Sequence, residues 1–342
     1  MPPIAKGSEG EGVKDKKRLI VAIFGILSVL FLITLSLVTA MEEPLVTRII
    51  IIPKGASAKK IAQDLEDEGL IKSRLAFLIL ARITGAGNRL KAGEYELNNR
   101  MGMIKIIKRL EEGKGILHHI TIPPGYTLKD IANLLEREHL VDRHRFLKLC
   151  HDPSFINRSL SIAPPSLEGY LFPDTYFLHR GMDEERVISL MVNRFNEMVK
   201  REDIKDEMLH RTITLASIVE REAKIKEEYH IISAVFHNRL KRNMALQSCA
   251  TVLYALGERK PHLSVEDTRI PSPYNTYIHP GLPPGPICNP GTLAIKATLN
   301  PADVDYLYFV LREDGSHIFS KTGSSHTFYK STLVGRKKHR ID

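Results

Sequence analysis

An uninterrupted stretch without charged residues, from Leu19 to Ala40, constrains this chain of 342 residues more than any other feature. As a helix, such a stretch extends about 33 Å and matches a bilayer core about 30 Å thick. Lysines and an arginine precede it, whereas acidic residues follow it. Because positive flanks tend to stay inside, the sequence predicts a cytoplasmic tail (1–18), one transmembrane helix (19–40) and an exported remainder.

A cleaved signal peptide is the alternative interpretation of this segment. Small residues at 38–40 would suit a signal peptidase, but the stretch exceeds the usual apolar region of about 7–15 residues. Its length therefore favours a retained anchor in the cytoplasmic (inner) membrane, and either interpretation exports the body of the protein.

The net charge of +9 is concentrated at the two ends of the chain. Residues 1–18 carry a net +2 and residues 336–342 a net +3, which leaves +4 for everything between them. A nucleic-acid-binding module usually shows a concentrated basic face, so we expect no nucleic-acid partner. The three cysteines, at 150, 249 and 288, are too few to form a disulfide framework.

A repeat with an offset of 70 residues follows the apolar stretch. Residues 52–55 (IPKG) match residues 122–125 (IPPG), and Ser57 and Thr127 stand where helix N-caps are expected. Each copy has the pattern of a β-branched strand, a Pro/Gly turn and an amphipathic helix. The copies resemble LysM-like modules, which bind polymers containing N-acetylglucosamine; a purely structural βα unit is the alternative.

The remaining patterns predict an α+β fold. A polar segment at 111–115 favours a boundary between a LysM-like domain (45–116) and a catalytic domain (117–342). The latter divides into the second LysM-like repeat (117–156) and a mixed α+β catalytic core (157–342). In the core we expect a helix from Asp183, helical structure from Met208 to Arg242 and a hairpin around Asp314-Gly315, with loops elsewhere in the last third.

The segment TITLASIVEREAK at 212–224 is the strongest chemical signal. It is apolar until Glu220 and Glu222, and a carboxyl on an apolar helix face has a raised pKa, which suits a general acid. The alternative is that both glutamates only mark where the helix emerges into water, and periodicity does not choose between them. Cys249 and Cys288 could be nucleophiles, but no supporting motif accompanies them.

Several segments resemble the YceG-like family of endolytic murein transglycosylases in order and spacing. The resemblance covers nearly everything after residue 45. It rests on residues 168–176 (EGYLFPDTY), 215–220 (LASIVE), 235–240 (VFHNRL), 246–248 (LQS), 275–277 (NTY), 281–291 (GLPPGPICNPG), 300–302 (NPA) and 306–310 (YLYFV). The family usually has Asp-Pro-Thr after the LQS-type segment, whereas this chain has Cys249-Ala250-Thr251.

The resemblance implies that Glu220 is the catalytic residue. It would act as general acid and then as base, cleaving the β-1,4 bond between N-acetylmuramic acid and N-acetylglucosamine to leave a 1,6-anhydro end. It further implies action on nascent peptidoglycan strands, termination of their elongation and proximity to peptidoglycan synthases. The family motifs offer as substrate-binding candidates Glu168, Tyr176, Asn238, Gln247, Ser248, Asn275 and Tyr277.

Other functions remain open from the residues alone. A non-catalytic, membrane-anchored scaffold that binds the cell wall would explain the repeat and the anchor without Glu220. A membrane-bound hydrolase would use Cys249 or Cys288 and would lose activity on thiol alkylation. We expect neither a metal nor a cofactor in any of these cases.

Overall fold

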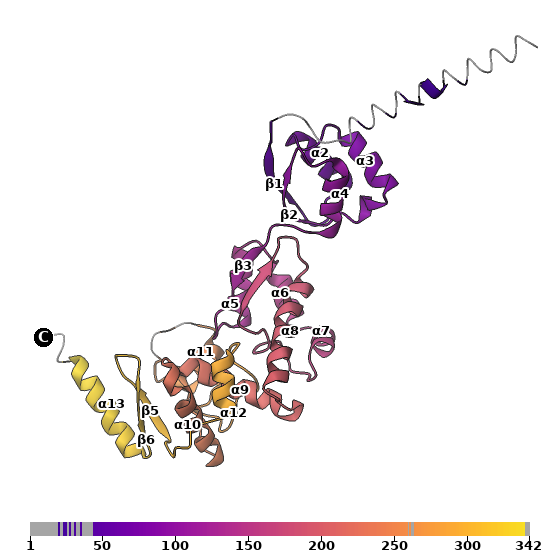
Figure 1. Cartoon of the computed structure of the whole chain (residues 1–342). Helices are drawn as coiled ribbons and strands as arrows, with labels where there is room; N and C mark the ends of the chain where they lie inside the picture. The colour runs from indigo at the N-terminus through magenta and orange to yellow at the C-terminus, as the bar shows by residue number, and fades with distance from the viewer. Residues whose placement is uncertain are drawn as a thin grey trace, which may run out of the picture. The chain divides into compact units, whose positions relative to one another are not determined.

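The computed structural model describes residues 44–258, 260 and 263–338, as well as positions 20, 23–25, 27, 28, 31 and 35. The predicted membrane helix at 19–40 therefore lies mostly outside the described residues. Within the described part of the chain, no helix has both the length and the apolar character needed to cross a bilayer. The chain forms two compact units (Figure 1): one runs to Leu117 and includes His179–Gly181, and the other contains the rest from His118.

The first unit is a two-stranded antiparallel sheet packed against helices. Its strands pair with Ile50 opposite Tyr95, and one cluster of buried side chains, including Phe77 and Ile106, forms its core. Its elements are β1 (Thr47–Ile52), α2 (Ala58–Asp67), α3 (Arg74–Ile83), η1 (Ala86–Asn88), β2 (Gly93–Asn98) and α4 (Met103–Glu112).

The second unit is larger and mostly helical, with two short antiparallel strand pairs. Its elements are β3 (His118–Thr121), α5 (Leu128–Arg137), α6 (Arg143–Leu149), α7 (Pro153–Ser159), β4 (Thr175–Leu178), α8 (Glu184–Arg201), α9 (Asp206–Glu222), η2 (Lys226–Glu228), α10 (Tyr229–Lys241), α11 (Cys249–Leu256), η3 (Asp267–Arg269), α12 (Thr292–Leu299), β5 (Tyr308–Leu311), β6 (His317–Ser320) and α13 (Gly323–Lys338). Helices with small segregated sheets agree with the expected α+β class.

The sequence repeat is also a repeat of structure. In the first unit β1 pairs with β2 across α2 and α3, and in the second β3 pairs with β4 across α5 and α6. The expected N-caps are present, because Ser57 accepts a hydrogen bond from the amide of Lys60 and Thr127 from that of Asp130. The returning strand β4 lies beyond residue 156, where the sequence pattern ended the second copy.

Helix α9 is the central element of the second unit. Leu215, Ala216, Ile218 and Val219 are all buried, so the helix is apolar on every side before its last turn. Such a helix requires cover all round, and α9 contacts α10, α11 and α12 (Figure 1). Its last turn, which carries the two glutamates, is thereby placed among the N-terminal ends of neighbouring helices.

The prediction of continuous helical structure from Met208 to Arg242 is wrong. Helix α9 ends at Glu222, Ala223 adopts an extended conformation (φ −70°, ψ 136°), and η2 leads into α10. Ala223 is buried, and its amide still bonds to the carbonyl of Val219. Helices α11, α12 and α13 also occupy part of the last third, where loops were expected. The helix from Asp183 and the hairpin of β5 and β6 are confirmed.

Candidate active site

The carboxyl group of Glu220 is held from two directions. Its Oε1 accepts a hydrogen bond from the Tyr229 hydroxyl at 3.0 Å, and its Oε2 accepts one from the Gly291 amide at 2.9 Å. Gly291 is the N-cap of α12, so the carboxyl stands at the positive end of that helix. Both donors stabilise the charged form of the acid, and they fix the orientation of its carboxyl group.

The break after α9 makes the tyrosine contact possible. In a continuous helix, nine residues would separate Glu220 and Tyr229 by about 13 Å along the axis. The extended residue Ala223 instead turns the chain back, so that the first residue of α10 reaches the last turn of α9.

The Pro/Gly turn of the second repeat covers the same carboxyl group. A Cβ atom on Gly125 would lie 3.9 Å from Cγ of Glu220, and one on Gly291 would lie 3.0 Å from Pro124. Asn289, which is fully buried, ties this turn to the loop before α12, because its side chain donates to the carbonyl of Tyr126 at 2.9 Å. The repeat thus forms one wall of the site.

The electrostatic environment suits proton transfer. Burial raises the pKa of Glu220, and the Gly291 amide, the Tyr229 hydroxyl and the charge of Arg221 oppose this increase. A carboxyl in this balance can hold a proton at higher pH than an exposed glutamate, yet its ionised form has donors ready to stabilise it.

Glu222 has different partners from Glu220. Its Oε1 accepts hydrogen bonds from the Ser248 hydroxyl at 2.5 Å and the Ala250 amide at 3.4 Å. It therefore holds the start of α11, a role typical of an acidic side chain at a helix N-terminus. The two glutamates that periodicity left equivalent are separated by their tertiary partners.

Glu168 is buried at the start of another helix. Its carboxyl oxygens accept hydrogen bonds from the amide of Leu128 at 3.1 and 3.2 Å, from Tyr254 at 3.3 Å and from Asn289 at 3.3 Å. Burial raises its pKa to about 8, even though the Leu128 and Tyr254 hydrogen bonds favour the ionised form. At neutral pH this group is therefore mostly protonated.

Three of the other candidates make hydrogen bonds to backbone carbonyls. The Asn238 amide donates to Val304 and Tyr306. The Asn275 amide donates to Thr268 and Ile270, and the Tyr176 hydroxyl donates to Phe172. These bonds hold loops and one strand in place.

The last two candidates lie close to the start of α11. Gln247 has a positive φ of 48°, and its backbone amide donates to the backbone carbonyl of Thr276. The Tyr277 hydroxyl lies 3.1 Å from the sulfur of Cys249. Substrate binding by all seven candidates stays a prediction. Among the described residues, no group of three or more His, Cys, Asp or Glu side chains is arranged to hold a metal ion.

The sequence analysis missed Tyr229 and Asn289 as parts of this site. Tyr229 follows a polar segment with no motif of its own, so no local signal could have identified it. Asn289 lies inside the GLPPGPICNPG segment, and its place in a segment that carries the resemblance was an available signal.

The cysteines do not resemble activated nucleophiles. Cys288 is fully buried, and burial raises the pKa of its thiol well above the ordinary value. Burial also raises the pKa of Cys249, although its side chain is partly accessible. A reactive cysteine requires the opposite shift, toward thiolate.

Comparisons with known proteins agree with this arrangement. The model of the YceG-like family matches residues 50–331. An endolytic murein transglycosylase of Bacillus subtilis (strain 168) is 36% identical over 332 residues, which cover 91% of each chain. One from Streptococcus pneumoniae (serotype 2, strain D39) is 33% identical over 76% of this chain and 53% of its own length.

A solved structure shares the fold at a similar level of identity. The crystal structure of a YceG-like protein from Listeria monocytogenes matches with a TM-score of 0.56 and 34% identity, covering 84% of this chain and all of that one. The family match spans both units and includes Glu220, Tyr229 and Gly291. The chain belongs to the YceG-like family.

Proposed function

We propose that this protein is an endolytic murein transglycosylase that cleaves the bond between N-acetylmuramic acid and N-acetylglucosamine. The observation that carries the proposal is the half-buried Glu220 carboxyl, which has a raised pKa and two fixed donors. Hydrolysing glycosidases generally need a second carboxyl as base or nucleophile. Here the adjacent Glu222 is hydrogen-bonded into α11, which favours a mechanism with one carboxyl.

In the first step, protonated Glu220 donates its proton to the glycosidic oxygen as the C1–O bond of the muramic residue breaks. The carboxylate then accepts the proton of the muramic C6 hydroxyl while that oxygen forms a bond to C1. The products are a 1,6-anhydro end and a free 4-hydroxyl, and no water is consumed. The intramolecular attack gains from proximity.

Tyr229 and Gly291 have a defined part in this cycle. Their donors stabilise the carboxylate at the moment when it becomes charged, and they already point at its oxygens before the reaction. Such preorganised donors act in the way that oxyanion holes do. Burial opposes them, so the acid retains enough proton affinity to act first as a donor.

The Glu220→Gln variant tests the proposal directly. Glutamine preserves the size of the side chain but cannot donate a proton as an acid, so we expect release of 1,6-anhydro ends from sacculi to fall at least about a hundredfold. Mass spectrometry of the products measures it, with Glu227→Gln, at an exposed glutamate in η2, as the matched control. Anhydro ends at the wild-type rate from folded Glu220→Gln would overturn the proposal.

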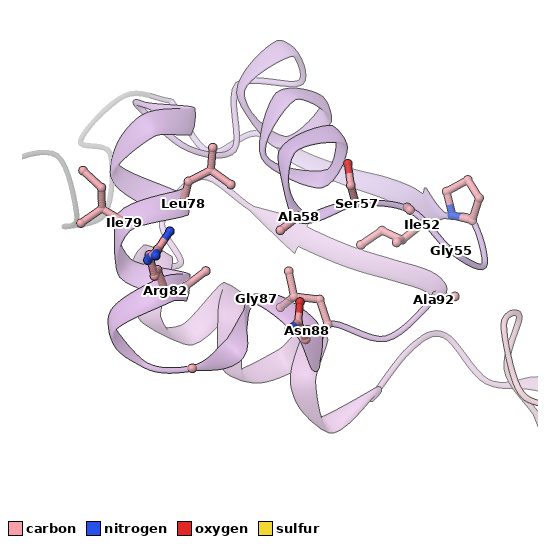
Figure 2. A pocket seen from close by; sticks show the side chains of 15 residues that line it. Ile52, Gly55, Ser57, Ala58, Leu78, Ile79, Arg82, Gly87, Asn88 and Ala92 are labelled. Atoms are coloured by element: carbon pink, nitrogen blue, oxygen red, sulfur yellow. The ribbon is translucent and has the colours of Figure 1, made fainter.

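A groove in the first unit supports an additional glycan-binding role. Its volume is about 930 Å³, and it lies between α3 and the turn that leads from β1 into α2. Figure 2 shows Leu78, Ile79 and Arg82 on one side and Ser57 and Ala58 on the other. Apolar surfaces with a few polar groups suit a sugar polymer. This LysM-like role also supports the second candidate function, a scaffold that binds the cell wall without cutting it.

The anchor predicted at 19–40 would hold the protein at the outer face of the cytoplasmic membrane. We propose that the protein acts there on nascent strands and terminates their elongation close to peptidoglycan synthases. Basic residues before 19–40 and acidic residues after it support this orientation.

A further inference from the structure

The second unit contains a cavity of about 520 Å³. Neither Glu220 nor its two hydrogen-bond donors, Tyr229 and Gly291, line this cavity. Its walls come from the first turns of α5, the C-terminal half of α11 and the segment at 272–274. The rings of Tyr254 and Tyr274 form one side, with centroids 5.0 Å apart. This volume is in the range of ligand-sized pockets, about 300–1,000 Å³.

Two cationic side chains line this cavity. The ammonium group of Lys129 makes no ion pair or hydrogen bond within the part of the chain that the structure describes, and a Cβ atom on Gly257 would lie 3.8 Å from it. Arg221 uses one of its donors, to the carbonyl of Gly125. Several donors therefore remain available to an anionic ligand.

Within the described part of the chain, the acidic side chains of the cavity form no ion pair with Lys129 or Arg221. Asp130 bonds to the amide and hydroxyl of Thr127, and Glu258 pairs with Lys260. Glu168, with a pKa raised to about 8 by burial, is mostly uncharged at neutral pH. Among the residues described, the cavity thus contains two cations outside ion pairs, two acids with other partners, one mostly neutral acid and two aromatic rings.

The cavity is also close to the carboxyl group of Glu220, both along the sequence and in space. Arg221 lines it, whereas the preceding residue, Glu220, has its carboxyl among Tyr229 and Gly291. The turn at Gly125 lies between them, because a Cβ atom there would lie 3.8 Å from Arg221 and 3.9 Å from Glu220. A substrate group bound in the cavity would therefore lie close to the glycosidic bond that Glu220 is proposed to cleave.

We propose that this cavity binds a carboxylate of the peptide substituent on the murein strand, with Lys129 as its principal partner. The inference rests on the proposed function. In murein that carries peptides the sugars are uncharged, because the lactyl carboxyl of each muramic residue forms the amide bond to the peptide, and the carboxylates belong to the peptides. A carboxylate provides the counter-charge that an available ammonium lacks, and charge-assisted hydrogen bonds are among the stronger polar contacts. The protein therefore prefers strands whose peptide carboxylates are free over strands in which these groups are amidated.

The test compares two substrates with two lysine variants of the full chain. Uncrosslinked strands with peptides, and the same strands after conversion of their peptide carboxyl groups to amides, are cleaved by wild type, Lys129→Met and Lys59→Met. Lys59 occupies the position equivalent to Lys129 in the first repeat and does not line the cavity. We expect the ratio of kcat/KM for strands with free peptide carboxylates to amidated strands to fall about tenfold in Lys129→Met alone.

Lys129→Arg should retain most of this preference, because it keeps the positive charge. The proposal is overturned if the ratio in Lys129→Met equals that of wild type, or if Lys59→Met lowers it equally.

Equilibrium binding separates failure of this proposal from failure of the proposed function. Calorimetry with N-acetylmuramyl dipeptide and its diamide requires no cleavage. We expect wild type to bind the acid about tenfold more tightly than the diamide, and Lys129→Met to lose this difference. Equal binding of both probes by wild type would overturn the cavity proposal, even if anhydro ends form. If the difference is present but no anhydro ends form, the proposed function fails and the binding site stands.

Discussion

At the scale of single residues, the proposed chemistry depends on the environment of one carboxyl. Burial in the last turn of α9 raises the pKa of Glu220, while Tyr229 and the Gly291 amide stabilise its charged form. An acid that must first donate and then accept a proton needs both tendencies at once. Neither donor is close to Glu220 in sequence.

Removing the tyrosine hydroxyl should shift the pH dependence of cleavage. In Tyr229→Phe the ionised form loses a hydrogen bond, so the pKa of Glu220 rises further. Activity requires protonated Glu220 and falls as pH rises through that pKa, so the alkaline limb should move upward by about one pH unit. The rate at the optimum should fall about tenfold, because the carboxylate intermediate is less stable.

A pH–rate profile of anhydro-end release measures both effects. Tyr306→Phe, at a tyrosine whose ring packs against Phe319, is the control. An alkaline limb in Tyr229→Phe that coincides with that of wild type would show that the hydroxyl does not set the pKa of the acid.

At the scale of elements, three glutamates each stand at the start of a different helix. Glu168 accepts from the first residue of α5, Glu222 from the first turn of α11, and Glu220 from the N-cap of α12. Unpaired amides and the helix dipole make each of these ends a favourable place for a carboxyl oxygen that accepts hydrogen bonds. The shared geometry positions the helices, and only the surroundings distinguish the proposed catalytic group from the other two.

Glu222 should therefore contribute to stability more than to chemistry. In Glu222→Ala the first turn of α11 loses its acceptor and Ser248 loses its partner, so the free energy of unfolding should fall by about 1–2 kcal/mol. Urea denaturation measures this loss, with Glu227→Ala as the exposed control. A loss of anhydro-end release as deep as that of Glu220→Gln, in a protein of wild-type stability, would contradict this assignment.

At the scale of the whole molecule, the chain uses one motif for two purposes. The copy in the first unit borders a groove of about 930 Å³, whereas the copy in the second unit brings its Pro/Gly turn against Glu220, the proposed catalytic residue. The same β-α-α-β arrangement thus serves a proposed binding surface in one unit and a wall of the active site in the other.

The groove can be tested apart from cleavage. In Glu220→Gln protein, which leaves the sacculus intact, the additional changes Arg82→Ala and Asn88→Ala remove two polar groups that line the groove. We expect binding to sacculi, measured by cosedimentation, to weaken about tenfold through loss of hydrogen bonds to sugar. The exposed pair Lys105→Ala and Lys108→Ala on α4 is the control. Equal binding by both double variants would leave the groove without a role in glycan binding.

Local sequence patterns accounted for much of the fold. The repeat, its N-caps at Ser57 and Thr127, the helix after Asp183 and the hairpin at Asp314-Gly315 all follow from periodicity and turn chemistry, which act over a few residues. The break at Ala223 did not follow, because the segment around it has the composition of a helix and is interrupted by tertiary packing.

The sequence by itself determined that a carboxyl would end an apolar helix, because burial of α9 follows from its composition. Only the tertiary structure decided which carboxyl has which role. Gly291 lies 71 residues from Glu220, and Ser248 lies 26 residues from Glu222. Hydrogen bonds over such separations leave no trace in the periodicity of the helix, yet they orient one glutamate toward the proposed chemistry and place the other at the start of a helix.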